Sequence, residues 1–179
     1  EMCIRDSPFW GVDAGGYSGF ADEETYLRWT EFATFSPIMR FHGVTPREPW
    51  AYSRYAVSVY KFYSWLRENL LKYSVHTAEE AHKTGIPMMR PLPMVFPEDK
   101  EAVYWEDEYF YGSDLLVAPV HQEGEKRRIY FPSGSWINLL AVPITPVSFS
   151  TSGRLIPEFA RIDVNGRKVA RPNLFFFRK

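Results

Sequence analysis

A strand–helix–strand order near the start of this chain restricts its fold more than any other feature. Residues 8–13 form a short apolar run that ends in Asp13, and the glycine-rich loop after it favours a buried strand over a helix. Asp22 stands where it can cap the N-terminus of a helix, and Pro37 ends that helix. A second apolar run, residues 38–42, completes the pattern. This order is typical of a βαβ unit and predicts an α/β fold with parallel strands.

A long helical pattern follows over residues 53–84, with apolar side chains at a period of 3.6. If this helix is interrupted, we expect the break near Ser74. Gly85 stands at the position that commonly ends a helix. From residue 86 onward prolines are frequent and short apolar runs alternate with turn residues, which predicts an antiparallel β module.

The pattern divides the chain into three parts. Residues 1–7 have the character of an arbitrary, non-native junction and carry no weight for the fold. Residues 8–85 hold the βα pattern, and residues 86–179 hold the β pattern, which weakens beyond Trp136. In that tail, residues 164–167 (Val-Asn-Gly-Arg) are the one clear hairpin signal.

The composition excludes several classes of function. Hydrophobic residues make up 45% and charged residues 24% of the chain, which is ordinary for a soluble globular protein. The formal net charge of −1 gives no electrostatic footprint for nucleic acid or an anionic membrane, and no apolar run is long enough to span a bilayer. Dinucleotide, phosphate-loop and metalloprotease motifs are absent, and the 4 histidines lack metal-ligand spacing. We therefore expect no cofactor and no metal ion, and the cellular compartment is left open.

Aromatic residues are unusually frequent, at 17% of the chain with 6 Trp, 11 Tyr and 14 Phe. Such a chain can simply use its aromatic rings to build a core. The alternative is that some rings line a pocket, where flat apolar faces stand beside polar groups. A sugar suits that kind of pocket, because its C–H faces lie on rings while its hydroxyl groups need hydrogen-bond partners.

Two polar side chains, Asp13 and His42, stand at the ends of the two predicted strands. Taken alone, Asp13 can be a turn residue and His42 a structural histidine. If the strands are neighbours in a (β/α)8 barrel, both side chains emerge at its C-terminal face, where active sites of that fold lie. A carboxylate accepts hydrogen bonds from sugar hydroxyls, and a histidine donates or accepts them. Strand alternation places Arg40 on the same side as His42, and we expect it to pair with a buried carboxylate and fix the shape of the pocket.

Several sequence blocks resemble glycoside hydrolase family 31, and they occur in that family's order. The blocks are residues 9–17 (FWGVDAGGY), 39–43 (MRFHG) with 46–50 (PREPW), 85–91 (GIPMMRP), 96–97 (FP), 112–120 (GSDLLVAPV) and 132–136 (PSGSW). The resemblance implies that the βα part is the C-terminal fragment of a (β/α)8 TIM barrel, its last two βα units. The β part would begin an antiparallel β-sandwich.

The same resemblance implies roles for individual residues. In the family, the positions of Asp13 and His42 bind hydroxyl groups of the sugar in the −1 subsite. The positions of Trp10 and Tyr17 are aromatic neighbours of that pocket. With Arg40, these residues are our candidate substrate-binding set.

The resemblance also implies a parent protein that is a retaining exo-acting α-glycosidase, with α-glucosidase favoured over α-xylosidase. Its partner would be an oligosaccharide or an α-glycoside. Retention needs a nucleophile and an acid/base carboxylate about 5–5.5 Å apart. The family carries this pair on earlier barrel strands, upstream of Pro8. We therefore expect both in a missing N-terminal part of the same protein and expect no activity from residues 1–179 alone.

The chain departs from the family pattern in two places, and two other classes of function stay open. Val12 stands where the family often has His, and after Trp136 the pattern fades, with residues 155–161 a distorted match. One alternative is a non-catalytic carbohydrate-binding module, which requires that the whole chain folds by itself. The other is a structural β protein without a ligand, which requires that Asp13 and His42 lie far apart.

Overall fold

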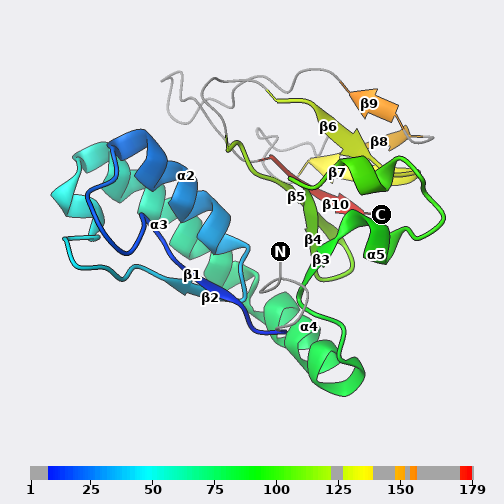
Figure 1. Ribbon diagram of the computed structural model, residues 1–179, viewed down its shortest axis with the longest axis horizontal. Helices are drawn as coiled ribbons and strands as arrows, with labels where there is room; N and C mark the ends of the chain where they lie inside the picture. Colours follow the sequence, from blue (N-terminus) through cyan, green and yellow to red (C-terminus); the bar gives the residue numbers. More distant parts are fainter. Residues whose placement is uncertain (1–7, 122–126, 139–147, 152–153, 157–173, 179) are drawn as a thin grey trace. The chain divides into compact units, whose positions relative to one another are not determined.

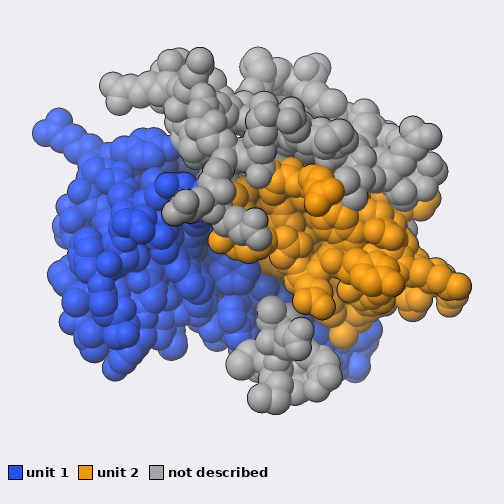
Figure 2. All heavy atoms as spheres, turned by 45° about the horizontal axis from the view of Figure 1, so that its top comes forward, with its two compact units in different colours: residues 1–89 blue, residues 90–179 orange. Residues whose placement is uncertain are grey.

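The computed structural model describes residues 8–121, 127–138, 148–151, 154–156 and 174–178 (Figure 1). The chain divides into two compact units, residues 1–89 and residues 90–179, which Figure 2 shows in different colours. Long helices belong to the first unit, and most of the strands belong to the second.

The first unit contains the predicted strand–helix–strand order. Its elements are β1 (Gly11–Asp13), α2 (Glu23–Thr34), β2 (Ile38–Arg40), the 3-10 turn η1 (Pro49–Ala51), α3 (Arg54–Asn69) and α4 (Leu71–Thr84). Strands β1 and β2 pair in parallel, with Gly11 opposite Ile38 and Asp13 opposite Arg40. A Cβ atom on Gly11 would lie 2.8 Å from the Ile38 Cβ, so glycine is needed for this close approach. The prediction of a parallel βαβ unit is confirmed.

The second strand ends earlier than the sequence predicts. β2 stops at Arg40, so Phe41 and His42 belong to the loop that follows. Phe41 directs its ring into an aromatic cluster, where it contacts Tyr26 of α2 and Tyr60 of α3 with ring centroids 5.6 and 5.2 Å away. Because the strand ends before His42, the alternation that placed Arg40 and His42 on one side does not extend to His42.

Helix α2 begins where the sequence predicts. The Asp22 side chain accepts a hydrogen bond from the Thr25 amide at 2.8 Å and so caps the helix. Tyr26 and Ala33 are fully buried on the inner face. The start of α2 is tied to the start of α3, because the Ser53 hydroxyl donates to Glu23 Oε1 at 2.6 Å while it caps α3.

The long helical pattern forms two helices instead of one. The break lies at Leu70, four residues before the expected position at Ser74. Helix α4 ends at Gly85 in the left-handed conformation, with φ of 76° and its amide bonded to the Ala81 carbonyl, which confirms the predicted C-terminus. Across the described residues, no helix is both long and apolar enough to cross a bilayer.

The second unit is an antiparallel β structure, as the sequence predicts. Its elements are β3 (Met89–Pro91), α5 (Leu92–Val95), η2 (Ala102–Tyr104), β4 (Tyr109–Tyr111), β5 (Leu115–Ala118), β6 (Ile129–Phe131), β7 (Gly134–Asn138), β8 (Ser148–Thr151), β9 (Arg154–Ile156) and β10 (Leu174–Arg178). Six strands form one sheet in the order β3-β4-β5-β10-β7-β8, and β6 pairs with β9 in a second sheet. The pairs β4–β5, β5–β10, β10–β7, β7–β8 and β6–β9 are all antiparallel.

Among the described residues of this unit, a hydrophobic core joins β4, β5 and β7 of the larger sheet to β6 of the smaller one. Its largest fully buried side chain is Trp136, which donates its indole N–H to the Pro132 carbonyl at 3.0 Å. The rings of Phe110 from β4 and Phe131 from β6 lie 6.0 and 5.7 Å from it. The predicted hairpin at residues 164–167 lies outside the described residues, as does most of the 155–161 segment.

Candidate functional site

Asp13 and Arg40 form an ion pair at the carboxyl ends of β1 and β2. They are register partners, and side chains at one register position of neighbouring strands point to the same face of a sheet. The Arg40 Nε donates to Asp13 Oδ1 at 2.7 Å. The Asp13 side chain keeps 21% of its surface exposed and that of Arg40 keeps 59%. The carboxylate expected for Arg40 is therefore Asp13 itself, and it is partly exposed instead of buried.

Tyr17 and His42 meet in the loops that follow the two strands. Their ring centroids are 5.7 Å apart, and the Val44 amide donates to the Tyr17 carbonyl at 2.9 Å. Both rings are exposed in this chain, Tyr17 by 56%. A phenol and an imidazole are thus presented together, beyond the same ends of the strands that carry Asp13 and Arg40.

The two loops approach each other so closely that one position requires glycine. A Cβ atom on Gly43 would lie 2.7 Å from the Tyr17 carbonyl oxygen and 3.0 Å from that of Gly16. Arg47 reinforces the contact, because its buried guanidinium donates to the Gly16 carbonyl at 2.8 Å and to the Gly19 carbonyl at 2.7 Å. No role for Arg47 follows from the local sequence, since a lone arginine between prolines gives no periodic signal. Its place in the 46–50 block was the only available clue.

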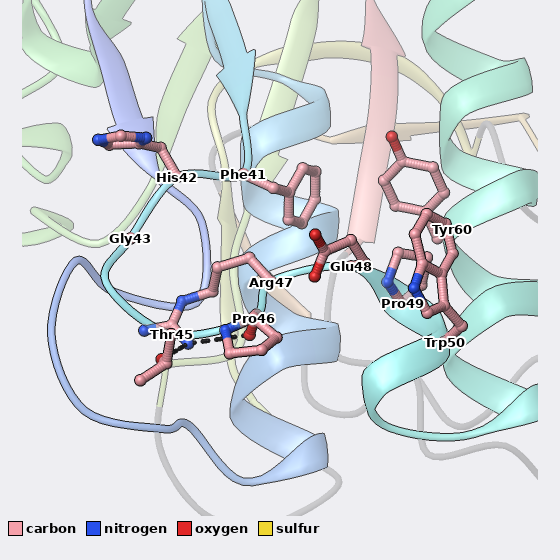
Figure 3. A pocket seen from close by; sticks show the side chains of 10 residues that line it. All are labelled: Phe41, His42, Gly43, Thr45, Pro46, Arg47, Glu48, Pro49, Trp50 and Tyr60. Carbon is pink, nitrogen blue, oxygen red and sulfur yellow. Dashed lines mark hydrogen bonds between the residues drawn. The ribbon is translucent and has the colours of Figure 1, made fainter.

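A cavity of about 250 Å3 opens beside His42. Its lining comes from the segment after β2 and from α3, namely Phe41, His42, Gly43, Thr45, Pro46, Arg47, Glu48, Pro49, Trp50 and Tyr60. Figure 3 shows the imidazole of His42 on one side of this segment and the rings of Phe41, Trp50 and Tyr60 on the other. Asp13, Tyr17 and Arg40 do not contribute to the lining of this cavity.

Trp10 lies apart from these two pairs. Its ring packs edge-on against Phe32 of α2, with ring centroids 5.8 Å apart. Trp10 lies directly before β1, so strand alternation does not fix its direction relative to Asp13. The structure therefore brings Asp13 to Arg40 and Tyr17 to His42, whereas the ring contact of Trp10 is with α2.

The chemistry of this group is that of hydrogen bonding beside an aromatic surface. A carboxylate, an imidazole and a phenol together offer acceptors, donors and flat ring faces, which suits a ligand rich in hydroxyl groups. Within the part of the chain that the structure describes, no three His, Cys, Asp or Glu side chains are grouped to hold a metal ion.

Comparison with known proteins assigns this arrangement to a family. Residues 1–77 match the model for the TIM-barrel domain of glycosyl hydrolases family 31, and residues 85–162 match the model for the family 31 C-terminal domain. The chain belongs to glycoside hydrolase family 31.

Individual relatives are much longer than this chain. It is 36% identical over 171 residues to an isomaltosyltransferase of Sporosarcina globispora, an alignment that covers 87% of this chain and 15% of the relative. It is 35% identical over 140 residues to an alpha-xylosidase of Saccharolobus solfataricus, covering 74% of this chain and 19% of that protein. The crystal structure of a GH31 alpha-xylosidase from a soil metagenome, complexed with xylose, matches with a TM-score of 0.82 and 29% identity. That match covers 96% of this chain and 28% of the other.

Proposed function

We propose that this chain is part of a retaining exo-α-glycosidase that hydrolyses terminal α-glucosidic or α-xylosidic bonds. In that enzyme it supplies sugar-binding residues of the −1 subsite. The observation that carries the proposal is the parallel pairing of β1 and β2. This pairing sets Asp13 beside Arg40 at the strand ends, and the loops beyond bring Tyr17 to His42.

Asp13 and His42 have complementary roles in this proposal. The Asp13 Oδ1 accepts from Arg40, which leaves Oδ2 as an acceptor for a sugar hydroxyl. Because the Arg40 guanidinium holds the carboxylate in place, little reorganisation is needed when the sugar binds. The His42 imidazole donates to or accepts from a second hydroxyl, and the exposed ring of Tyr17 beside it offers an apolar face to the sugar. Trp10 is left with a packing role against α2.

The two catalytic carboxylates are assigned to a preceding part of the parent protein. Asp13 is paired with Arg40 and Asp22 caps α2, and we assign neither of them a catalytic role. A retaining mechanism requires such a pair about 5–5.5 Å apart. We therefore expect residues 1–179 alone to hydrolyse no glycoside.

The test is Asp13→Asn in the intact parent enzyme, assayed with aryl α-glucosides and aryl α-xylosides. Hydrogen bonds to a charged group contribute about 1.5–3 kcal/mol, so we expect kcat/KM to fall about 10- to 150-fold. The loss should lie mainly in kcat, because hydroxyl contacts strengthen as the sugar approaches its oxocarbenium-like transition state. His42→Ala should cause a comparable loss.

Asp22→Asn is the matched control, since it makes the same Asp-to-Asn change at the N-cap of α2, the next element after β1. Asn caps helices about as well as Asp, so activity and melting temperature should both stay unchanged. Wild-type kcat/KM for Asp13→Asn at unchanged stability would remove Asp13 from the sugar site. A lower melting temperature with near-normal turnover would assign it a structural role. Sugar binding by the parent protein without any hydrolysis would favour the carbohydrate-binding module instead.

A further inference from the structure

We propose that Arg47 is a positioning residue of the −1 subsite, which clamps the loop that carries Tyr17 to the loop that carries His42. This inference rests on the proposed function and deepens it. Arg47 touches no substrate in this scheme, because its side chain is buried with only 3% of the residue exposed. It acts through the two rings that it holds together.

The clamp consists of hydrogen bonds from one planar group to both loops. Arg47 Nε donates to the Gly16 carbonyl at 2.8 Å, and a terminal nitrogen donates to the Gly19 carbonyl at 2.7 Å. These two carbonyls lie on either side of Tyr17 in the chain. The other terminal nitrogen donates to the Thr45 hydroxyl at 2.5 Å, and that hydroxyl donates to Gly19 at 2.6 Å. Figure 3 shows Arg47 and Thr45 joined in this way in the segment after β2.

The loop that carries Tyr17 needs such a restraint because of its glycines. Gly16 and Gly19 have φ of 81° and 72°, in the left-handed region that glycine enters without a steric penalty. Glycine also permits many other conformations, so the loop's own sequence does not select one. The two carbonyls that Arg47 binds belong to these same two glycines. The clamp therefore acts where the backbone has the most freedom.

The chemistry of the clamp is specific to arginine. A buried guanidinium is tolerated only when its N–H groups are hydrogen-bonded, and here the loops themselves supply the acceptors. Its donors form a rigid fork that reaches several oxygens at fixed angles, whereas a lysine ammonium is a point charge on a flexible stem. Lysine at position 47 would keep the charge and lose the geometry.

The consequence for activity follows from the contact between Tyr17 and His42. Their rings are 5.7 Å apart, and the loops meet through the Val44–Tyr17 backbone bond. Releasing the clamp lets both rings shift relative to Asp13, and a displacement of about 1 Å in a positioned group can cost about 100-fold in rate.

The experiment uses the intact parent enzyme with Arg47→Met and Arg47→Lys, and with Arg54→Met as a control at an exposed arginine of α3. We expect Arg47→Met to lower kcat/KM about 100-fold, Arg47→Lys to lower it at least about tenfold, and the control to change nothing. Gly43→Ala keeps Arg47 but forces the loops apart at Tyr17, so it should lower kcat/KM even where Arg47→Met fails to fold.

A double-mutant cycle separates positioning from a merely structural role. In a Tyr17→Ala/His42→Ala background there are no rings left to position. Adding Arg47→Met to it should therefore lower kcat/KM further by less than about threefold. A full additional loss in that background would overturn the proposal. If Asp13→Asn and His42→Ala lose activity while Arg47→Met and Gly43→Ala keep it, the clamp alone is wrong. If Asp13→Asn and His42→Ala keep activity, the proposed function itself fails.

Discussion

Arg40 holds Asp13 from the directly opposite register position of the neighbouring parallel strand, through an Nε–Oδ1 bond of 2.7 Å. Both side chains are partly exposed, and ion pairs of that kind contribute only about 0–1 kcal/mol to stability. The value of the pair lies in orientation, because it fixes which carboxylate oxygen faces away from Arg40.

Replacing Arg40 should therefore affect the site more than the fold. For Arg40→Met in the parent enzyme we expect the free energy of unfolding to change by less than about 1 kcal/mol. The same variant should lower kcat/KM by about 3- to 30-fold, less than Asp13→Asn does, because the charge of Asp13 remains. Steady-state kinetics and thermal unfolding check the two parts. A large loss of stability with unchanged kinetics would contradict the orienting role.

Arg67 should show the opposite behaviour. From α3 its guanidinium donates to the carbonyls of Thr34, Ser36 and Pro37, at 2.7, 2.7 and 2.8 Å, where α2 turns into β2. Arg67→Met removes these donors, and each carbonyl left without one costs about 1–3 kcal/mol. In the parent enzyme we expect the free energy of unfolding, measured with denaturant, to fall by at least about 3 kcal/mol. The folded fraction should keep a near-normal kcat/KM.

The control for Arg67 lies on the same helix. Arg54 is exposed in the first turn of α3, so Arg54→Met should change the free energy of unfolding by less than about 0.5 kcal/mol. Equal effects of the two substitutions would show that the carbonyl bonds of Arg67 do not stabilise the α2–β2 connection.

Glu108 should make the second unit sensitive to pH. Burial raises the pKa of this carboxyl from 4.5 to about 8. The hydrogen bond from the Tyr130 amide and the Arg127 guanidinium both lower the pKa, but the effect of burial is larger. Oε1 accepts from both groups, whereas Oε2 has no hydrogen-bond partner among the described residues. The nearby Asp107 carboxylate adds to the rise.

The direction of the pH effect follows from this raised pKa. The folded state binds the proton more tightly than the unfolded state, so the stabilising contribution is complete below pH 4.5 and is lost as pH rises through about 8. Glu108→Gln keeps an acceptor oxygen and cannot ionise. We expect it to be more stable than the wild type at pH 9, by a few kcal/mol at most, and no more stable at pH 5. Calorimetry of the parent enzyme at both pH values tests this, with exposed Glu106→Gln as the control. If the difference in stability between Glu108→Gln and the wild type is the same at pH 5 and pH 9, the predicted pH effect of Glu108 is wrong.

The sheet of β1 and β2 has unpaired edges among the described strands, which predicts that residues 1–179 aggregate when expressed alone. Among the described strands, β1 and β2 pair only with each other. Strands with unpaired edges offer backbone groups to other chains and favour aggregation. We expect the isolated chain to be insoluble or to unfold without a sharp transition. A soluble monomer with one cooperative thermal transition would contradict this and would favour a module that folds by itself.

The sequence by itself determined the features that depend on neighbouring residues. Asp22 caps α2 through an amide three residues away, and Gly85 ends α4 because its own backbone takes the left-handed conformation. The order of strand, helix and strand, the parallel pairing and the antiparallel second unit were also predictable. Contiguous motifs such as residues 9–17 indicated the family as well, because a motif is read directly along the chain.

Only the tertiary structure decided which side chains meet. β2 ends at Arg40, and the Phe41 ring that follows packs on α2 and α3; neither contact is visible in a local pattern. The partner of Arg40 is 27 residues away, and the carbonyls that Arg47 binds at Gly16 and Gly19 are 31 and 28 residues away. Such pairs depend on strand register and on the approach of two loops, which local sequence does not encode. The physical reason is that the geometry of a hydrogen bond or a ring contact is set only after distant segments have packed.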